Sequence, residues 1–240
     1  MTRKALITGG SGGIGQAIAR RLAADGIHVW VHYHSNLQAA GAIVETIQGQ
    51  GGTATALGFD VSDWAATRAS LERLLEAEGA MDIVVHNAGI TDDAAFPGMD
   101  YSQWQKVIDT SLNGFFHVTR PLLMPMIRQR WGRIVSIASI AALHGNRGQA
   151  NYAAAKAGVI GASRSLAREV ASRGICVNVV APGFVDTGMI ADIPAETIKA
   201  LVPMQRSGRA DEIAAVVGFL CSDDTAYMTG EVLNVSGGII

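Results

Sequence analysis

Tyr152 and Lys156 are the residues of this sequence whose types and spacing most clearly favour chemistry. They lie four positions apart in the alanine-rich stretch 149–156, which favours a helix, and on a helix such a pair lies one turn apart on one face. A free tyrosine, with a pKa of about 10, is a weak acid near neutrality, but a neighbouring ammonium group lowers that pKa. We therefore expect a tuned proton donor, although a surface helix with one aromatic residue and one cation explains this stretch at least as well by itself.

A glycine-rich turn near the N-terminus is the second candidate. The turn, at residues 8–15, follows an apolar run and precedes a helical pattern. Glycines at such a junction let the backbone approach a pyrophosphate, and the helix N-terminus then faces the negative charge. The spacing is looser than the usual dinucleotide fingerprint, but the position in the first strand–helix unit favours a dinucleotide cofactor. The residues expected to contact it are Gly9, Ser11, Gly12, Gly13, Ile14 and Gly15.

The residues after the second apolar run bear on which dinucleotide binds. A carboxylate there would bind the ribose 2′-hydroxyl and favour NAD, but this segment, at residues 32–36, contains none. We expect His34, Ser35 and Asn36 to accommodate a 2′-phosphate, and we therefore expect NADP(H), although no arginine or lysine lies nearby in the sequence to bind that phosphate.

Asp60 and Val61 follow the third apolar run and are expected to meet the adenine. A carboxylate can accept a hydrogen bond from the exocyclic amine of that base. The alternative for Asp60 is the N-cap of the next helix, a role that Ser62 or Asp63 can also fill.

The overall composition narrows the classes of protein. The 240 residues are 49% hydrophobic and 17% charged, with a net charge of −2, and no basic stripe suggests a nucleic-acid partner. No apolar run reaches the roughly 18 residues of a membrane span, and the first residues lack the apolar region of a signal peptide, so we expect a cytoplasmic protein. Cys176 and Cys221 are expected to be buried free thiols, and we expect no metal site.

Apolar runs alternate with helical patterns along the whole chain. We expect strands at residues 5–8, 28–32, 53–57, 81–86, 133–137, 176–180 and 232–235, and helices at 16–24, 37–50, 64–78, 101–130, 150–172 and 211–221. This alternation predicts one α/β domain over residues 1–240, a Rossmann-type doubly wound parallel sheet of about seven strands with helices on both faces. Each candidate residue group follows a strand, at the edge where such sheets bind ligands. Pro121 and Pro125 are expected to bend the long helix at 101–130.

The order of these motifs resembles the short-chain dehydrogenase/reductase family over essentially the whole chain. The motifs are the glycine turn, Asn87-Ala88-Gly89, Ser139, the pair Tyr152 and Lys156, and Pro182-Gly183. Within that family the chain is most similar to 3-oxoacyl-[acyl-carrier-protein] reductases, over residues 148–158, 165–174 and 177–184. The joint pattern is far more specific than any one motif.

The resemblance implies roles for these residues. Tyr152 would protonate the carbonyl oxygen of the substrate while NADPH delivers hydride to carbon. Lys156 would hold the hydroxyls of the nicotinamide ribose and lower the pKa of the tyrosine, and Ser139 would hydrogen-bond the substrate oxygen, with an ordinary turn serine as the alternative. The residues that would line the cofactor are Asn87, Ala88, Gly89, Pro182, Gly183, Val185 and Thr187, with Tyr152 and Lys156.

Three positions depart from the pattern of the family. Ser111 stands where the family has an asparagine that helps to relay protons behind the lysine, and Asn113, about 200° further around a helix, cannot replace it. We expect Ser111 to act through a bound water, because a hydroxyl both donates and accepts. His86 replaces another asparagine and is expected to be structural, and Gly12 stands where these reductases often have a basic residue that supports NADP binding.

The resemblance also implies a substrate and partners. We expect NADPH-dependent reduction of a 3-oxoacyl thioester bound to acyl carrier protein, in fatty-acid or polyketide-type biosynthesis. Arg130 and Arg173 would dock the acidic carrier protein near the active-site entrance, with two solvated arginines at helix ends as the alternative. Residues 188–208 would form a lid over the acyl chain, and the helices at 101–130 and 150–172 would pair between the subunits of a homotetramer.

Two other functions stay open on the sequence. One is a short-chain dehydrogenase or ketoreductase that acts on acyl-CoA or on another small carbonyl compound or alcohol. The other is a non-catalytic cofactor-binding subunit, which Ser111 supports and the intact Tyr152, Lys156 and Ser139 argue against.

Overall fold

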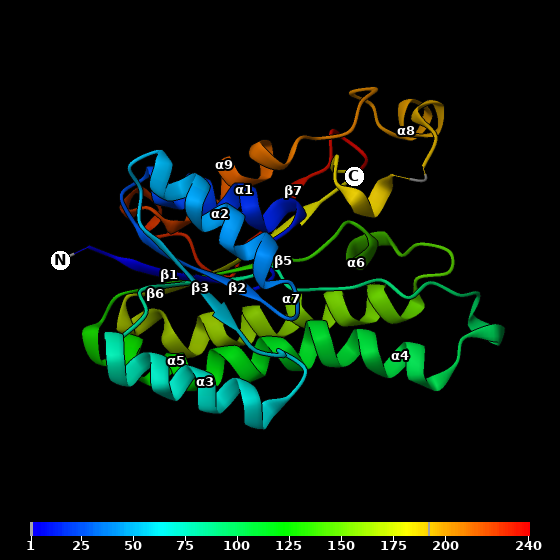
Figure 1. The fold of residues 1–240 in the computed structure, drawn as a ribbon. Helices are drawn as coiled ribbons and strands as arrows, with labels where there is room; N and C mark the ends of the chain where they lie inside the picture. The colour runs from blue at the N-terminus through cyan, green and yellow to red at the C-terminus, as the bar shows by residue number, and fades with distance from the viewer. Residues whose placement is uncertain (1, 192) are drawn as a thin grey trace.

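Seven parallel strands form one sheet at the centre of the protein (Figure 1), seen in a computed structural model that describes residues 2–191 and 193–240. The strands lie in the order β3-β2-β1-β4-β5-β6-β7. The doubly wound α/β architecture predicted from the alternation of elements is confirmed, with seven strands. Their bounds are β1 (Lys4–Ile7), β2 (His28–Tyr33), β3 (Ala54–Gly58), β4 (Ile83–His86), β5 (Gly132–Ile137), β6 (Ile175–Pro182) and β7 (Val232–Val235).

Helices cover both faces of the sheet (Figure 1). One face carries α1 (Gly13–Ala24), α2 (Leu37–Gly49) and α9 (Ala210–Cys221), and the other carries α3 (Trp64–Glu78), α4 (Tyr101–Ile108), α5 (Gly114–Gln129) and α7 (Ala150–Val170). Strand β1 shows why the strands read as continuous apolar runs. Ala5 and Ile7 point into one hydrophobic cluster and Leu6 into the other, because successive side chains of a strand point to opposite faces.

The element boundaries differ from the prediction by a few residues at several ends. β3 and β4 begin one and two residues later than predicted, and β6 continues to Pro182. Two short helices were not predicted as such, α6 (Ala141–His144) and α8 (Ala195–Leu201). Single 3-10 turns lie at η1 (Phe96–Gly98), η3 (Ala171–Arg173), η4 (Gly188–Ile190) and η5 (Asp223–Thr225).

The long helix predicted at residues 101–130 is divided into two. A π-helical turn, η2 (Asp109–Asn113), joins α4 to α5. In a π-turn the hydrogen bond spans five residues rather than four, which inserts one extra residue into the helix. Pro121 and Pro125 lie inside α5, so the interruption of the α-helix occurs at η2 and not at the prolines.

The strand order determines where a ligand can bind. β1 lies between β2 and β4, so the chain turns in opposite directions on the two sides of the crevice between β1 and β4. Ligands of doubly wound sheets bind at this crevice, outside the carboxyl ends of the strands. The segments that follow β1, β4, β5 and β6 all emerge at this edge.

Three observations concern other classes of site. In residues 2–191 and 193–240, no helix is both long enough and apolar enough to cross a membrane. The same part of the chain holds no group of three or more His, Cys, Asp or Glu side chains that could bind a metal ion. Cys176 and Cys221 are buried free thiols, as predicted.

Candidate active site

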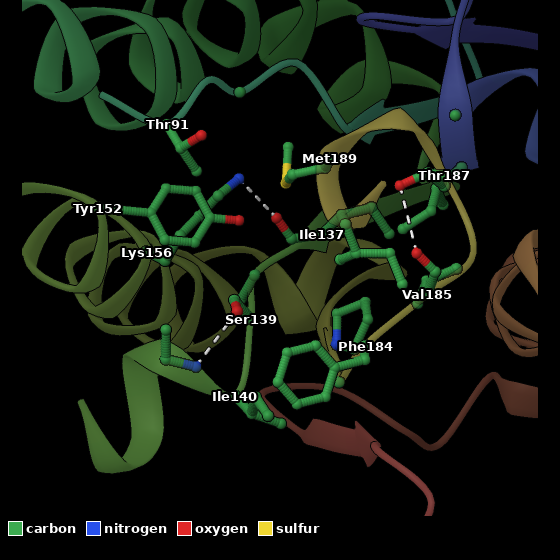
Figure 2. Close-up of a pocket in the computed structure, with 18 of the residues that line it drawn as sticks. Thr91, Ile137, Ser139, Ile140, Tyr152, Lys156, Phe184, Val185, Thr187 and Met189 are labelled. Atoms are coloured by element: carbon green, nitrogen blue, oxygen red, sulfur yellow. Dashed lines mark hydrogen bonds between the residues drawn. The ribbon is translucent and has the colours of Figure 1, made fainter. Parts of the chain in front are cut away.

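A cavity of about 1030 Å³ opens at the carboxyl edge of the sheet. Figure 2 shows Ser139, Tyr152 and Lys156 on one side of it and Val185, Thr187 and Met189 on the other. The structure thus brings together most of the site residues predicted from the sequence. Those that line the cavity are Gly9, Ser11, Gly12, Gly13, Ile14, Asn87, Ala88, Gly89, Ser139, Tyr152, Lys156, Pro182, Gly183, Val185 and Thr187.

The glycine loop after β1 is tightly packed on its protein side and open on its cavity side. A Cβ atom on Gly15 would lie 2.2 Å from the carbonyl oxygen of Gly9, whereas one on Gly12 would have no other atom within 4 Å. Gly9 and Gly13 have φ angles of 61° and 49°, in the left-handed region that favours glycine. The open backbone leads into α1, whose first N–H groups have no partner within the helix, so the loop fits the pyrophosphate of a dinucleotide.

Asn87 and Thr8 join this loop to the end of β4. The side-chain amide of Asn87 donates to the carbonyl oxygens of Thr8 and Gly9, at 3.1 and 2.9 Å. Thr8 Oγ1 accepts the backbone N–H groups of Asn87 and Ala88, both at 3.0 Å. Thr8 was not among the predicted site residues, and its place beside the first glycine is the sequence signal that could have identified it.

His32 is a second residue that the sequence reasoning missed. It is the next-to-last residue of β2, only 1% exposed, and its Nδ1 accepts the N–H of Gly9 at 3.0 Å. Its Nε2 lies 2.9 Å from the carbonyl oxygen of Phe59, and because a carbonyl only accepts, Nε2 carries the proton. Burial lowers the pKa of His32 to about 4, so the ring is neutral at pH 7. Its position at the end of an apolar strand carried no signal of these contacts.

Tyr152 and Ser139 present two hydroxyl groups to one corner of the cavity. Tyr152 is 8% exposed, and its hydroxyl points toward Ser139 and the cavity (Figure 2). Ser139 follows β5, and its Oγ accepts the N–H of Ala141 at 3.1 Å. A hydroxyl that accepts this bond can still donate one, either to Tyr152 or to a ligand.

Asn151 holds the first turn of α7 in place. Its side-chain amide donates to the carbonyl oxygens of Asp92 and Gln103, at 2.9 and 3.3 Å. Its Oδ1 accepts the backbone N–H of Tyr152 at 2.8 Å. Asn151 is fully buried, and it fixes the start of the helix that carries Tyr152.

The pKa of Tyr152 differs from the expectation drawn from its sequence spacing. Burial raises this pKa above 10.0, the hydrogen bond with Ser139 lowers it, and the charge of Asp93 raises it, with a net rise. Lys156 lies with Nζ 5.7 Å from the centre of the tyrosine ring. The expectation that Lys156 lowers the pKa of Tyr152 is therefore not met by the protein alone, because the ammonium group lies over the ring while burial penalises the phenolate.

Lys156 reaches the cavity through a space that Gly89 leaves open. Its Nζ donates to the carbonyl oxygen of Ile137, at the end of β5, at 2.9 Å. Burial lowers the pKa of Lys156 to about 8. A Cβ atom on Gly89 would lie 2.9 Å from that Nζ and 3.4 Å from Oγ of Ser111, so Ser111 and Lys156 face the same small space.

Ser111 is buried in the π-turn η2, and its Oγ has no hydrogen-bond partner in the part of the chain that is described. A buried hydroxyl without a partner is costly, so this position suits a water molecule. Asn113 is turned elsewhere, because its side-chain amide donates to Asp109 at 2.6 Å. The arrangement agrees with the expectation that Asn113 cannot occupy the place of Ser111.

His86 is buried beside the site without entering the cavity. Its Nε2 lies 2.8 Å from Oγ1 of Thr119, and its ring packs against Phe115. Burial, with a smaller contribution from the charge of Lys156, lowers the pKa of His86 to about 3. These contacts agree with the structural part expected of this histidine.

The segment after β6 crosses over the glycine loop. A Cβ atom on Gly13 would lie 3.5 Å from the methyl group of Thr187, and Thr187 Oγ1 donates to the carbonyl oxygen of Val185 at 3.3 Å (Figure 2). An isolated bridge joins Gly208, the last residue of the predicted lid at 188–208, to Val185, which lies shortly before the lid begins. The apolar side chains that this segment adds to the cavity wall are Met189, Ile190, Ile193 and Leu201.

The residues predicted to meet the adenine end lie outside the cavity. His34 and Ser35 are exposed, and Nε2 of His34 is 3.6 Å from Oδ2 of Asp60. Asp60 is not the N-cap of α3, because Asp63 accepts the N–H of Ala66 and fills that role. Oδ1 of Asp60 instead accepts two hydrogen bonds from Ser62, at 2.7 and 2.8 Å.

Asn36 and Val61 belong to the same end of the site. Asn36 Oδ1 accepts the N–H of Ala39 and caps α2, which leaves Nδ2 as the group that could donate to a 2′-phosphate. Val61 is 5% exposed, and its side chain packs in the core, 3.3 Å from the position of a Cβ on Gly114. The side chain of Val61 therefore does not point toward a cofactor.

Arg130 and Arg173 lie at the opposite edge of the sheet from the cavity. They precede β5 and β6, at the amino ends of these strands. β5 alone spans six residues, which is about 20 Å. Within one chain, the expectation that both arginines lie near the active-site entrance is wrong, because the entrance is at the carboxyl ends of the same strands.

Comparisons with known proteins agree with this geometry. A family model described as enoyl-(acyl carrier protein) reductase matches residues 9–240. The 3-oxoacyl-[acyl-carrier-protein] reductase FabG of Escherichia coli (strain K12) is 47% identical over 98% of this chain and 96% of its own. The corresponding protein of Aggregatibacter actinomycetemcomitans is 45% identical over the full length of both chains, and the 3-oxoacyl-[acyl-carrier-protein] reductase of Synechocystis is 44% identical over 98% of this chain and 96% of its own.

Proposed function

Because the chain belongs to the short-chain dehydrogenase/reductase family, we propose that it reduces a 3-oxoacyl thioester on acyl carrier protein to the 3-hydroxyacyl thioester, in fatty-acid or polyketide-type biosynthesis. Similarity over the full chain to 3-oxoacyl-[acyl-carrier-protein] reductases supports this proposal. The description of the matching family model names a different reaction, the reduction of an enoyl group. The site therefore has to support the choice between the two reactions.

The pair of hydroxyls of Ser139 and Tyr152 is the observation that carries the proposal. When a carbonyl is reduced, the hydrogen bond and the proton both go to one oxygen atom. Two hydroxyls in one corner of the cavity provide this, with Ser139 as the donor that holds the oxygen and Tyr152 as the acid that protonates it. The hydrogen bond from Ser139 also offsets part of the effect of burial on the pKa of Tyr152.

The family uses a nicotinamide cofactor, which supplies the hydride when it is bound. The glycine loop, Asn87 and the residues from Pro182 to Thr187 would hold it, and Lys156 would hold the ribose hydroxyls. We propose NADP(H), because the end of β2 has no carboxylate and exposes His34 and Ser35 toward solvent, where a 2′-phosphate can be accommodated. Asp60 beside His34 would face the adenine.

Lys156 and Ser111 would restore the proton that Tyr152 gives up. Both face the small space beside Gly89, and a water there would satisfy the unpartnered hydroxyl of Ser111 and connect it to Lys156. Burial brings the pKa of Lys156 to about 8, close to neutrality, which suits a group that exchanges protons.

The substrate end of the cavity is apolar where residues 188–208 cover it. Met189, Ile190, Ile193 and Leu201 give this wall the character of a site for an acyl chain. We propose that this segment is a lid on the single domain formed by residues 1–240. Arg130 and Arg173 are left out of the proposed carrier-protein contact, because they lie at the amino edge of the sheet.

The assembly and the compartment are parts of the same proposal. A homotetramer paired through α5 and α7 would cover Phe116 and Met124, two exposed apolar side chains on α5. Light scattering coupled to size-exclusion chromatography should then give four times the chain mass of 25.1 kDa, and a monomer would contradict it. The free thiols of Cys176 and Cys221 suit the cytoplasm, which keeps thiols reduced.

An assay of cofactor oxidation tests the proposed reaction. Purified protein is offered acetoacetyl thioesters on carrier protein and on CoA, and crotonyl-CoA as an enoyl substrate, each with NADPH or NADH, while absorbance at 340 nm is followed. We expect NADPH oxidation with the acetoacetyl thioesters, fastest on carrier protein, and none with crotonyl-CoA. Oxidation with crotonyl-CoA alone would favour enoyl reduction, and no oxidation with any thioester would reject the proposal.

Tyr152→Phe removes the proposed acid and little else. We expect kcat to fall at least about 100-fold, while the dissociation constant for NADPH stays within about threefold of wild type, because the ring still fills its place. Tyr227→Phe is the matched control, since Tyr227 is fully exposed and does not line the cavity. Unchanged turnover in Tyr152→Phe would remove Tyr152 as the acid.

A further inference from the structure

The carbonyl oxygen and the N–H of Gly9 both form hydrogen bonds with side chains, each with a different residue. Its carbonyl oxygen accepts from the side-chain amide of Asn87 at 2.9 Å, and its N–H donates to Nδ1 of His32 at 3.0 Å. The next N–H of the loop, that of Gly10, donates to the backbone oxygen of His32 at 2.9 Å. His32 thus holds two successive residues of the loop, one through its ring and one through its backbone.

The other side of the His32 ring reaches a different segment. Its Nε2 donates to the carbonyl oxygen of Phe59 at 2.9 Å, and its ring packs against Phe59 with 4.1 Å between the ring centres. Phe59 directly precedes Asp60, at the end where the adenine would bind. One buried side chain therefore connects the loop that would bind the pyrophosphate with the segment that would meet the base.

The position of Gly9 matters for the whole loop. Its carbonyl oxygen would be 2.2 Å from a Cβ on Gly15, the third residue of α1, so the loop and the start of this helix are in close contact. If the N–H of Gly9 lost its acceptor, the loop would gain a partly buried donor without a partner, and a small rotation of Gly9 would move its carbonyl against α1. The first N–H groups of α1 are those available to a pyrophosphate.

We propose that His32 is a positioning residue for the dinucleotide, and that its Nδ1, through Gly9, sets the shape of the loop at the N-terminus of α1. The inference rests on the proposed function only in taking the ligand to be a nicotinamide dinucleotide. His32 does not line the cavity, so it acts through the loop and not by touching the cofactor. The proposed role depends on the acceptor at Nδ1, which binds Gly9, while the donor at Nε2 holds the ring in place through Phe59.

Two substitutions separate these two nitrogen atoms. In His32→Asn the carboxamide oxygen can take the place of Nδ1 and accept the N–H of Gly9. In His32→Gln the longer side chain can reach Phe59 but places no acceptor at Gly9. His28→Phe is the control, because His28 lies on the same strand, four residues earlier, and its side chain hydrogen-bonds Thr55 rather than the glycine loop.

The dissociation constant of NADPH is measured from its nicotinamide fluorescence, without any thioester, for the full-length protein. We expect about a tenfold weaker binding in His32→Gln, consistent with one lost hydrogen bond to a buried group. Binding in His32→Asn should stay within about threefold of wild type, and His28→Phe should bind as wild type does. In turnover, KM for NADPH should rise in His32→Gln while KM for the thioester stays constant.

The thermal midpoint of each variant separates positioning from a general loss of stability. If both His32 variants lower the midpoint alike but only His32→Gln loses affinity, the positioning role is supported. Wild-type affinity in His32→Gln, or equal losses in both variants, would overturn it and leave the proposed reductase activity intact. Conversely, weaker NADPH binding in His32→Gln alone, together with no reduction of any thioester, would reject the proposed reaction and leave the inference standing.

Discussion

Ser111, which stands where an asparagine was expected from the resemblance, occupies a clearly defined place in the structure. Its hydroxyl is buried with no partner in the described residues, and it faces the space beside Gly89 into which Lys156 also reaches. A water in this space could bond to both. The π-turn that carries Ser111 provides this placement, which Asn113 does not share.

Substitutions at Ser111 test whether it takes part in the proton supply. Ser111→Ala should lower kcat about fivefold, the equivalent of one hydrogen bond worth about 1 kcal/mol, with KM for NADPH unchanged. Ser111→Asn should keep or raise kcat, since an amide can hold the same water. Steady-state kinetics with an acetoacetyl thioester measures both, and a large loss in Ser111→Asn would show that the site uses another arrangement.

Some residues of the site could be predicted from the sequence and others could not. Tyr152 and Lys156 were singled out because their types and spacing carry chemistry directly, and Ser139 because its place in the sequence resembles the family. His32 and Thr8 were missed, since each bonds the backbone of a segment that follows another strand, and the partner of such a bond depends on the register of the sheet. Val61 was expected to meet the adenine together with Asp60, and only packing against α5 decides that its side chain faces the core.

At the scale of the elements, the strands were predictable and the joints between helices were not. The inner strands β1, β4, β5 and β6 are buried on both faces, so their apolar runs stand out from the amphipathic helices around them. The change from α4 to η2 depends on whether an N–H bonds to the fourth or the fifth preceding carbonyl. The two alternatives differ little in energy, and the sequence has no pattern that distinguishes them. The prolines in α5, which do leave a pattern, turned out to lie inside the helix.

The junction between the glycine loop and α1 should be the least tolerant of added volume. Gly15→Ala would bring a Cβ within 2.2 Å of the Gly9 oxygen and 2.6 Å of Nδ2 of Asn87. We expect the free energy of unfolding to fall by about 1–3 kcal/mol and NADPH binding to weaken, as measured by urea titration and fluorescence. Gly41→Ala in α2, where no atom lies within 4 Å, is the control and should raise stability by about 0.5–1 kcal/mol. Equal effects of the two substitutions would contradict the close contact.

At the scale of the whole molecule, two buried neutral histidines make the fold sensitive to acid. Burial lowers the pKa of His32 to about 4 and that of His86 to about 3, from 6.5 for an exposed ring. The unfolded chain therefore binds more protons than the native protein below pH 6.5. The stability from these two neutral rings is fully present above pH 6.5, and it is lost as the pH falls from 6.5 toward 4 and 3.

The range from pH 6.5 to 4.5 isolates these histidines from the carboxyl groups. Asp60, Asp223 and Glu212 also have lowered pKa values, but their contribution is lost only as the pH falls below the ordinary values of 3.8 and 4.5. Over the two pH units above 4.5, two histidines should cost on the order of 5 kcal/mol of unfolding free energy. Urea titrations followed by circular dichroism at fixed protein concentration measure this loss.

His86→Asn removes one of the two titrating rings while leaving a side chain that can still bond Thr119. Its unfolding free energy should therefore fall by only about half as much as that of wild type between pH 6.5 and 4.5, whatever its stability at pH 7.5. His144→Asn is the control, because His144 is exposed and its loss should leave the wild-type slope. If His86→Asn kept the wild-type slope, His86 would have to take up its proton in the native protein above pH 4.5. That result would contradict the lowered pKa of this ring, which is buried against Thr119 and Phe115.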